Sequence, residues 1–239
     1  MSVFVLVHGG WGGGWQWRPI ANALCRRGHE VYTPTLAGMG DRAHLVLDSA
    51  ALTLSTHIQD VVQLLYFEDL DDVILVGWSY GGAVVDGVAD QVPGRLRLVV
   101  NIDGEVVEEG RTLIDGWTPE ARNAMHDFLE DARATGWMRP PTADELADVL
   151  ADPHLRNWVA NRERPHPLAT DTEPYPDAGG RRHSVPHVFI RCTEDDQPEE
   201  ATVTRLRSDQ RWRFQEMALN HLCILYAPDE VAKVLHELS

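Results

Sequence analysis

Lysine is nearly absent from this chain of 239 residues, and long hydrophobic runs are absent altogether. Lys233 is the only lysine, so arginine supplies the other 20 of the 21 basic residues, a bias that we associate with GC-rich bacterial genomes. No apolar run approaches the ~20 residues that span a bilayer. The apolar stretch 3–7 is too short for a signal peptide and has no basic flank. We therefore expect a cytoplasmic protein of bacterial origin.

Cysteine is scarce too, and charge of one sign dominates. Cys25, Cys192 and Cys223 are widely spaced, show no metal-ligand pattern and cannot all pair within one chain, which suits a reducing compartment. Acidic residues outnumber basic residues by 37 to 21, for a formal net charge of -16. This excess disfavours nucleic acids and anionic membranes as partners. We expect a small-molecule substrate and no metal or organic cofactor, while a homodimer stays an open possibility.

Short apolar runs alternate with longer helical stretches, as in a parallel sheet covered on both faces. Strands are predicted near residues 3–7, 30–33, 73–77, 97–101, 186–191 and 211–217. Helices are predicted between and after them, near 16–27, 56–67, 80–91 and 229–238. The predicted fold class is α/β, with six mostly parallel strands and helices on both faces.

The stretch from about 105 to 184 interrupts this alternation. It contains possible helices near 119–135, 142–150 and 153–162, followed by a run rich in proline and charge. A helical insertion after the fourth strand is most simply a cap over the strand ends, where open parallel sheets bind their ligands. We therefore predict one domain, residues 1–239, that carries a cap at about 105–184.

The strongest chemical signal is Gly-Trp-Ser-Tyr-Gly-Gly at 77–82, between a predicted strand and a predicted helix. A Gly-x-Ser-x-Gly motif in this context is typical of a nucleophile turn. Small neighbours permit the strained backbone that lifts the serine hydroxyl above the sheet. The motif predicts Ser79 as nucleophile, against the alternative of a glycine-rich turn with an incidental serine.

A second signal, His8-Gly9-Gly10-Trp11, ends the first predicted strand. Acyl transfer creates an oxyanion that two backbone N–H groups must meet. We predict that Gly10 and Tyr80 supply these donors. A phosphate-binding turn is the alternative, but the chain has no Walker lysine and no Gly-x-Gly-x-x-Gly followed by an acidic ribose partner.

A serine hydroxyl needs a base, and eleven histidines compete for that role. His221 lies just after the last predicted strand and before the final helix, which places it at the carboxyl edge of the sheet. Most other histidines fall on or beside helices or in the cap, and His8 is expected to brace the oxyanion loop. His221 is therefore the predicted general base.

The acid that orients the histidine should follow the fifth predicted strand, where Glu194, Asp195 and Asp196 lie. We assign Asp195, with Asp196 second and Glu194 third. Asp103, after the fourth strand, is an alternative because some proteins with the same fold place the acid there. With Asp195, the three residues occur in the order Ser, acid, His that is typical of the α/β-hydrolase fold.

The pocket that receives the substrate should be apolar and aromatic. Its candidate substrate-binding residues are Trp11, Trp78, Trp117, Phe128, Trp137 and Trp158. Core packing is the alternative for each tryptophan of the cap.

The segment 3–17, VFVLVHGGWGGGWQW, resembles the opening of the plant methylesterase and hydroxynitrile lyase branch of α/β-hydrolases, and above all its bacterial relatives described as alkyl salicylate esterase-like. The resemblance covers nearly the whole chain, with GMGDRAHL at 38–45, THIQDVV at 56–62, EDLDDVILVGWSYGG at 68–82, PHPLAT at 165–170, FIRCTEDD at 189–196 and NHLCIL at 220–225. It implies a six-stranded parallel sheet that lacks the fold's first two strands. It also supports Asp195, which matches the aspartate of the family's Cys-Thr-x-Asp pattern.

Two positions of the resemblance favour hydrolysis. Gly9 and Leu222 stand where cyanohydrin-cleaving plant relatives carry Thr or Asn and Lys. Two departures concern the pocket: Trp78 replaces the usual His before the nucleophile, and Ile-Asp-Gly-Glu at 102–105 replaces Leu-Asp-Ala. The expected function is cleavage of an ester or related acyl bond of a small, largely apolar or aromatic molecule through an acyl-enzyme. The alternatives are a lyase, eliminase or cyclase of natural-product biosynthesis that reuses the triad, and a small-molecule receptor that retains it.

Overall fold

The computed structural model describes residues 1–45, 48–117, 119–124, 126–176, 179–194 and 200–239. One sheet runs through it, built from β1 (Val3–Val7), β2 (Glu30–Tyr32), β3 (Val73–Trp78), β4 (Leu96–Ile102), β7 (His187–Cys192) and β8 (Trp212–Met217). The strands lie in the order β2-β1-β3-β4-β7-β8, and every neighbouring pair is parallel. The predicted six-stranded sheet is confirmed.

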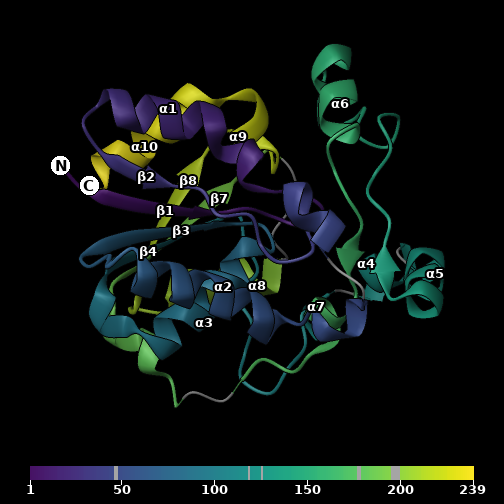
Figure 1. Cartoon of the computed structure of the whole chain (residues 1–239), viewed down its shortest axis with the longest axis horizontal. Coiled ribbons are helices and arrows are strands. Elements are labelled where there is room, and N and C mark those ends of the chain that lie inside the picture. Colours follow the sequence, from purple (N-terminus) through teal and green to yellow (C-terminus); the bar gives the residue numbers. More distant parts are fainter. Residues whose placement is uncertain (46–47, 118, 125, 177–178, 195–199) are drawn as a thin grey trace.

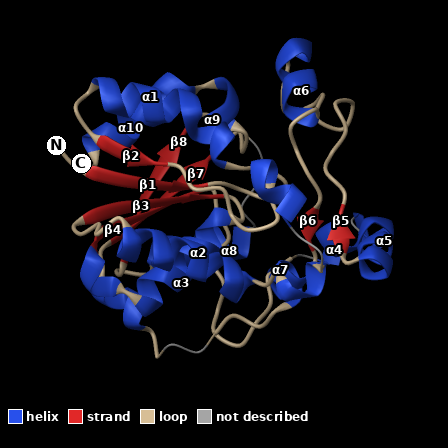
Figure 2. Ribbon diagram, in the orientation of Figure 1, coloured by secondary structure: helices blue, strands red, loops and turns tan. Residues whose placement is uncertain are grey.

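Helices cover both faces of this sheet (Figures 1 and 2). One face carries α1 (Arg18–Arg26), α9 (Cys223–Tyr226) and α10 (Pro228–Glu237). The other carries α2 (Leu54–Phe67), α3 (Gly81–Gln91) and α8 (Glu200–Ser208). Short 3-10 helices lie at Gly14–Trp17, Gly40–Leu45, Ser49–Ala51, Pro93–Arg95, Ile114–Gly116 and Arg181–Ser184. Within the described part of the chain, no helix is long and apolar enough to cross a membrane.

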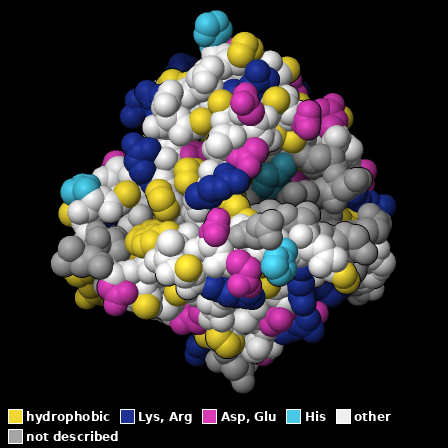
Figure 3. Space-filling model, turned by 90° about the vertical axis from the view of Figure 1, so that its right-hand side faces the viewer, with side chains coloured by type: hydrophobic (Ala, Val, Ile, Leu, Met, Phe, Trp, Pro, Cys, Tyr) yellow, Lys and Arg dark blue, Asp and Glu magenta, His cyan; other side chains and the backbone are white. Residues whose placement is uncertain are grey.

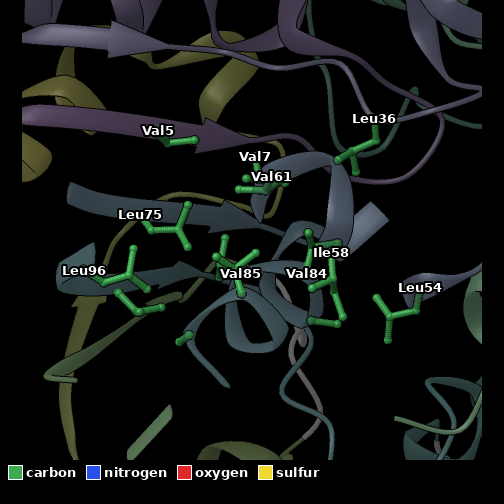
Figure 4. Packing of buried hydrophobic residues seen from close by; sticks show 14 of the residues in the cluster. Val5, Val7, Leu36, Leu54, Ile58, Val61, Leu75, Val84, Val85 and Leu96 are labelled. Carbon is green, nitrogen blue, oxygen red and sulfur yellow. The ribbon is translucent and has the colours of Figure 1, made fainter. Parts of the chain in front are cut away.

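The core lies in two layers because successive strand residues face opposite sides of the sheet. In β1, Val5 and Val7 belong to the cluster formed with α2 and α3, whereas Phe4 and Leu6 belong to the cluster formed with α1 and α10. Figure 4 shows the first of these clusters, in which the strand valines meet Ile58, Val61, Val84 and Val85. All six residues of β3 are buried, as expected for a central strand covered on both faces.

The 3-10 helix Arg181–Ser184, which precedes β7, packs against α3. Six other elements between β4 and β7 lie beyond the carboxyl ends of the strands, at the right of Figure 1. They are α4 (Pro119–Ala124), α5 (His126–Thr135), β5 (Trp137–Met138), α6 (Pro153–Ala160), β6 (His166–Pro167) and α7 (Ala169–Thr172). Strands β5 and β6 pair antiparallel. We call residues 105–184 the cap from here on; that it forms one domain with the rest stays a prediction.

One predicted element of the cap is wrong. Residues 143–149 form consecutive turns in place of the helix predicted near 142–150. Leu150 N–H donates to Leu146 O, four residues back, as in an α-helix. Val149 N–H donates to the same oxygen, three residues back, as in a turn or 3-10 helix. Asp144, Asp148 and Asp152 recur every four residues, and like charges at that spacing destabilise a helix. The antiparallel pair β5–β6 and the helix α8 were not predicted.

A buried group of charged side chains joins α3 to the chain that enters β7. Asp86 is 0% exposed; its Oδ2 lies 3.5 Å from the Arg182 guanidinium and its Oδ1 lies 3.8 Å from His187 Nε2. Burial raises the pKa of Asp86 to about 7 and lowers the pKa of His187 to about 4. His187 Nδ1–H donates to Val185 O at 2.8 Å, so its Nε2 carries a lone pair toward Asp86. A neutral carboxyl group suits this position.

We expect Asp86→Asn to flatten the pH dependence of stability. The folded-state pKa of Asp86, about 7, exceeds its ordinary value of 3.8. The folded protein therefore holds this proton more tightly, and the stabilisation is complete below pH 4 and is lost as pH rises toward 7. As the pH rises from 5 to 7.5, the wild type should lose about 2 kcal/mol of unfolding free energy that Asp86→Asn does not lose. Urea unfolding at several pH values measures this, with exposed Asp131→Asn as control. Identical pH slopes in wild type and Asp86→Asn would contradict the assignment.

Candidate active site

Ser79 occupies a sharp turn between β3 and α3. Its φ is +56°, in the left-handed region that non-glycine residues rarely adopt. A Cβ on Gly77 would lie 2.4 Å from Gly81 O, and one on Gly81 would lie 2.6 Å from Val7 O. Backbone therefore contacts backbone on both sides of the serine, which only glycine permits. The predicted strand, turn and helix around Ser79 are all present.

His221 lies between β8 and α9 and reaches this serine. Its Nε2 is 3.0 Å from Ser79 Oγ, within hydrogen-bond distance. Trp78 Nε1–H donates to His221 O at 2.7 Å, and the two rings lie 5.5 Å apart. The residue before the nucleophile thus fixes the backbone of the histidine. The predicted juxtaposition of Ser79 and His221 is what the geometry shows.

The other ring nitrogen of His221 bonds to Asp103. The Nδ1 to Oδ2 distance is 2.7 Å, and Asp103 is 2% exposed at the end of β4. Cys192 N–H donates to the second carboxylate oxygen at 3.0 Å, and Asp103 N–H donates to Ile190 O at 2.8 Å. These bonds tie the carboxylate to β7 and hold the residue at a φ of +47°.

This geometry adds a described partner to the candidate acids, and Asp195 stays a prediction. Asp195 and Asp196 lie outside the described residues, and Glu194 is exposed. The described acid on His221 is Asp103, which the sequence analysis ranked as an alternative. Strands β4 and β7 are neighbours, so the loops after both open at the same edge of the sheet beside the histidine. Chain order and family pattern favoured the loop after β7, and the described contact with His221 comes from the loop after β4.

His8 braces the loop after β1, as expected. It is fully buried; its Nδ1–H donates to Gly9 O at 2.8 Å, and its Nε2 accepts Leu36 N–H at 3.0 Å. Burial lowers the pKa of His8 to about 4, so the ring is neutral near pH 7. A Cβ on Gly9 would lie 2.9 Å from the Trp78 ring and 3.0 Å from Ser79 Cβ. The loop that carries Gly10 therefore lies directly against the nucleophile.

Tyr80, the other predicted oxyanion residue, is anchored by His57 on α2. Tyr80 Oη–H donates to His57 Nδ1 at 2.8 Å, and His57 Nε2–H donates to Ala37 O at 2.9 Å. Burial lowers the pKa of His57 to about 3, which keeps it neutral. The hydrogen bond to His57 fixes the side chain of Tyr80, whose backbone N–H is the predicted oxyanion donor. Nothing in the local sequence around His57 signals this role.

The cap holds the same loop from the other side. Trp11 has a φ of +58°; its Nε1–H donates to Met138 O at 3.2 Å, and its own carbonyl accepts Arg164 N–H at 2.9 Å. Cap and loop are therefore joined by two hydrogen bonds. Figure 3 shows this end of the molecule hollowed, with a histidine recessed in the hollow.

Three of the six predicted pocket aromatics gather beside this junction. The Trp11 ring meets the Phe128 ring edge to face at 6.3 Å, and Trp117 packs with Phe128 against the small cap core around Leu129 and Met138. The side chains of Trp11, Trp117 and Phe128 are all half-buried, and they lie where the loop after β1 meets the cap. Its contact with substrate stays a prediction.

The other three aromatics have different surroundings. Trp78 is 4% exposed and belongs to the core below His221, so it supports the base and offers the pocket little surface. Trp158 on α6 is 39% exposed and packs against Trp15 at 5.0 Å. Trp137 is half-buried on β5. Among the residues that the structure describes, no cluster of three or more His, Cys, Asp or Glu side chains is placed to hold a metal ion.

We expect Gly77→Ala to destabilise the protein by about 3 kcal/mol, because its methyl group would overlap the Gly81 carbonyl and force the turn apart. Thermal and urea unfolding measure the loss. Gly94→Ala is the matched control, since a Cβ there meets nothing within 4 Å. Equal stability of the two variants would show that the turn at Ser79 tolerates a side chain at position 77.

Comparison with known proteins agrees with this geometry. A model of the alpha/beta hydrolase family matches residues 4–234. The chain is 38% identical to the carbendazim hydrolyzing esterase of Nocardioides sp. over 100% of both chains. It is 26% identical to putative methylesterase 13 of Arabidopsis thaliana, over 99% of this chain and 56% of that protein. An extracellular alpha/beta-hydrolase from a Paenibacillus species superposes with a TM-score of 0.84 at 23% identity, covering 99% of this chain and 98% of that one. The chain therefore belongs to the alpha/beta hydrolase family, in the branch of the plant methylesterases.

Proposed function

We propose that this protein is a serine esterase that cleaves an ester or related acyl bond of a small, largely apolar or aromatic molecule. The observation that carries the proposal is the chain of hydrogen bonds from Ser79 Oγ through His221 to Asp103, at 3.0 and 2.7 Å. This is the arrangement that turns a weak serine hydroxyl into a nucleophile. A relative named as an esterase, 38% identical over its full length, supports it.

The reaction follows from the positions of these groups. Ser79 Oγ attacks the carbonyl carbon while His221 Nε2 accepts its proton, and Asp103 stabilises the imidazolium through Nδ1–H. The N–H groups of Gly10 and Tyr80 are the proposed donors to the oxyanion. The tetrahedral intermediate collapses as His221 protonates the leaving alcohol, which leaves an acyl-serine. Water, deprotonated by His221, then releases the acid.

A cyanohydrin lyase is disfavoured by the space at Gly9. The resemblance implies a threonine or asparagine side chain at this position in the cyanohydrin-cleaving plant relatives. Here even a Cβ would lie 2.9 Å from the Trp78 ring, so the loop has no room for such a side chain. Ester hydrolysis needs no group there. The formal net charge of -16 disfavours polyanionic partners and supports a small-molecule substrate as a further part of the proposal. Three widely spaced cysteines suit the reducing cytoplasm, which is the proposed location.

The experiment that tests the function is Ser79→Ala. The wild type should be labelled by a fluorophosphonate and should hydrolyse aryl and methyl esters, and the variant should lose labelling entirely and kcat by about 10⁴-fold or more. Mass spectrometry locates the label, and a stopped spectrophotometric assay measures turnover. Ester turnover that survives in Ser79→Ala would end the proposal. Labelling of the wild type without turnover of any ester would favour a non-hydrolytic enzyme.

The acid is tested by a pair of variants. Asp103→Asn should lower kcat by about 10³-fold or more, because an amide no longer fixes the tautomer of His221 or stabilises its cation. Asp195→Asn should cost much less. Steady-state kinetics with one aryl ester measures both, after unfolding curves show that each variant is folded. The reverse ranking of the two losses would return the role to Asp195.

A further inference from the structure

The short loop that carries His221 is in contact with two parts of the protein. The sheet reaches it through Trp78, whose Nε1–H donates to His221 O at 2.7 Å. The cap reaches the preceding residue, because Asn220 Nδ2–H donates to Val149 O at 2.7 Å. Val149 ends the consecutive turns at 143–149. Sheet and cap therefore bond to adjacent residues of the loop that holds the general base.

Asn220 is held in a single orientation by its other hydrogen bonds. Its backbone N–H donates to Tyr226 Oη at 2.8 Å. Its side-chain Oδ1 accepts Leu222 N–H at 2.9 Å, which closes a tight turn around His221. Because the amide oxygen is used by Leu222, the amide nitrogen is left to donate to Val149. One side chain thus shapes the loop of the base and ties that loop to the cap.

Apolar side chains reinforce this contact. Leu222 and Leu225 pack against the sheet core and also against a small cluster in the cap. The buried members of that cap cluster are Leu146, Leu150 and Val159. The residue directly after the base therefore lies between the core of the sheet and the core of the cap. Movement of the turns at 143–149 away from the loop would break the Asn220 bond and expose apolar surface, both of which cost free energy.

The position of His221 determines whether the serine can react. Its Nε2 lies 3.0 Å from Ser79 Oγ, and the bond to Asp103 at 2.7 Å orients the ring from the other nitrogen. A displacement of about 1 Å in such a group can lower the rate by about 100-fold. The ring of His221 can keep this distance only if the backbone that carries it is fixed, and Asn220 is the part of that backbone which the cap contacts.

We propose that Asn220 is a positioning residue whose hydrogen bond to Val149 O makes the placement of the general base depend on the docked cap. The inference rests on the proposed esterase function, to which it adds a link between the cap and the catalytic histidine. Asn220 acts through the backbone of His221 and takes no part in proton transfer. With the turns at 143–149 docked, the base is held beside Ser79.

Asn220→Ser tests this role. A serine hydroxyl can still accept the Leu222 N–H, but it is too short to reach Val149 O. We expect kcat on an aryl ester to fall by about 10- to 100-fold. The inhibition constant of an unreactive ether analogue of that ester should change by less than about threefold, because binding needs no base and the bonds of Trp11 still hold the cap. Steady-state kinetics measures both values.

Asn157→Ser is the matched control, since the Asn157 amide donates to Pro153 O at 2.8 Å within the exposed part of α6. It should alter neither kcat nor the inhibition constant. An unchanged kcat in Asn220→Ser would overturn the proposal. A loss of turnover matched by an equal weakening of the inhibitor would overturn it as well, because Asn220 would then only shape the pocket.

Asn220→Asp provides a second variant in case Asn220→Ser does not fold. Its carboxylate keeps the acceptor for Leu222 N–H but has no hydrogen to donate to Val149 O. It should therefore lose kcat by at least the same 10- to 100-fold, a range of about the size expected for a misplaced base. Full activity of this variant would show that the bond to the cap is dispensable.

Fluorophosphonate labelling of Ser79 separates the two levels of inference. A wild type that is neither labelled nor active on any ester refutes the esterase itself. A wild type that is labelled and active, together with Asn220 variants of undiminished kcat, refutes only the role of Asn220.

Discussion

The site depends on one close contact, where the backbone of the turn after β3 lies against the end of β1. Gly81 and Val7 O leave no space for a Cβ between them, and Ser79 takes a left-handed φ as a result. Ser79 O in turn accepts Glu105 N–H at 3.0 Å, which ties the loop after β4 to the same turn. The oxyanion loop and the loop of Asp103 therefore meet at the serine. The positions of these two loops follow from backbone packing at the turn. The side chains around the turn are therefore not needed to hold it and can serve the reaction.

Much of this arrangement could be predicted because its signals are local. Continuous apolar runs indicated the central strands of the sheet, and glycines around Ser79 indicated the turn. His221 was found because it follows the last strand. The acid could not be settled in this way, because loops after adjacent parallel strands end side by side and either can present a carboxylate. That choice depends on which loop bends toward the histidine, and the contacts with Cys192 and Ile190 that hold Asp103 link distant parts of the chain.

The cap was harder to predict than the sheet for a related reason. Its stretch at 143–149 has apolar residues at helical spacing, yet repeated aspartates at every fourth position oppose a helix. Strands β5 and β6 are two residues each and take their structure from pairing across the cap, so no run of residues signals them. His166 lies on one of these short strands. Its contacts with the rings of Tyr80 and Trp11 join distant parts of the chain, so no local pattern signals them.

One histidine with a carboxylate partner bonds to Ser79 and another lies against the oxyanion loop, and the two carboxylates contact different ring nitrogens. Asp103 holds the proton of His221 on Nδ1, so Nε2 is free to take the serine proton. Asp171 holds the proton of His166 on Nε2, so Nδ1 faces the oxyanion loop as an acceptor. The first pair belongs to the sheet, which fixes the chemistry, and the second belongs to the cap. The hydrogen bonds of Trp11 join the cap to the oxyanion loop. A change in the cap can therefore reach the oxyanion loop through these two bonds.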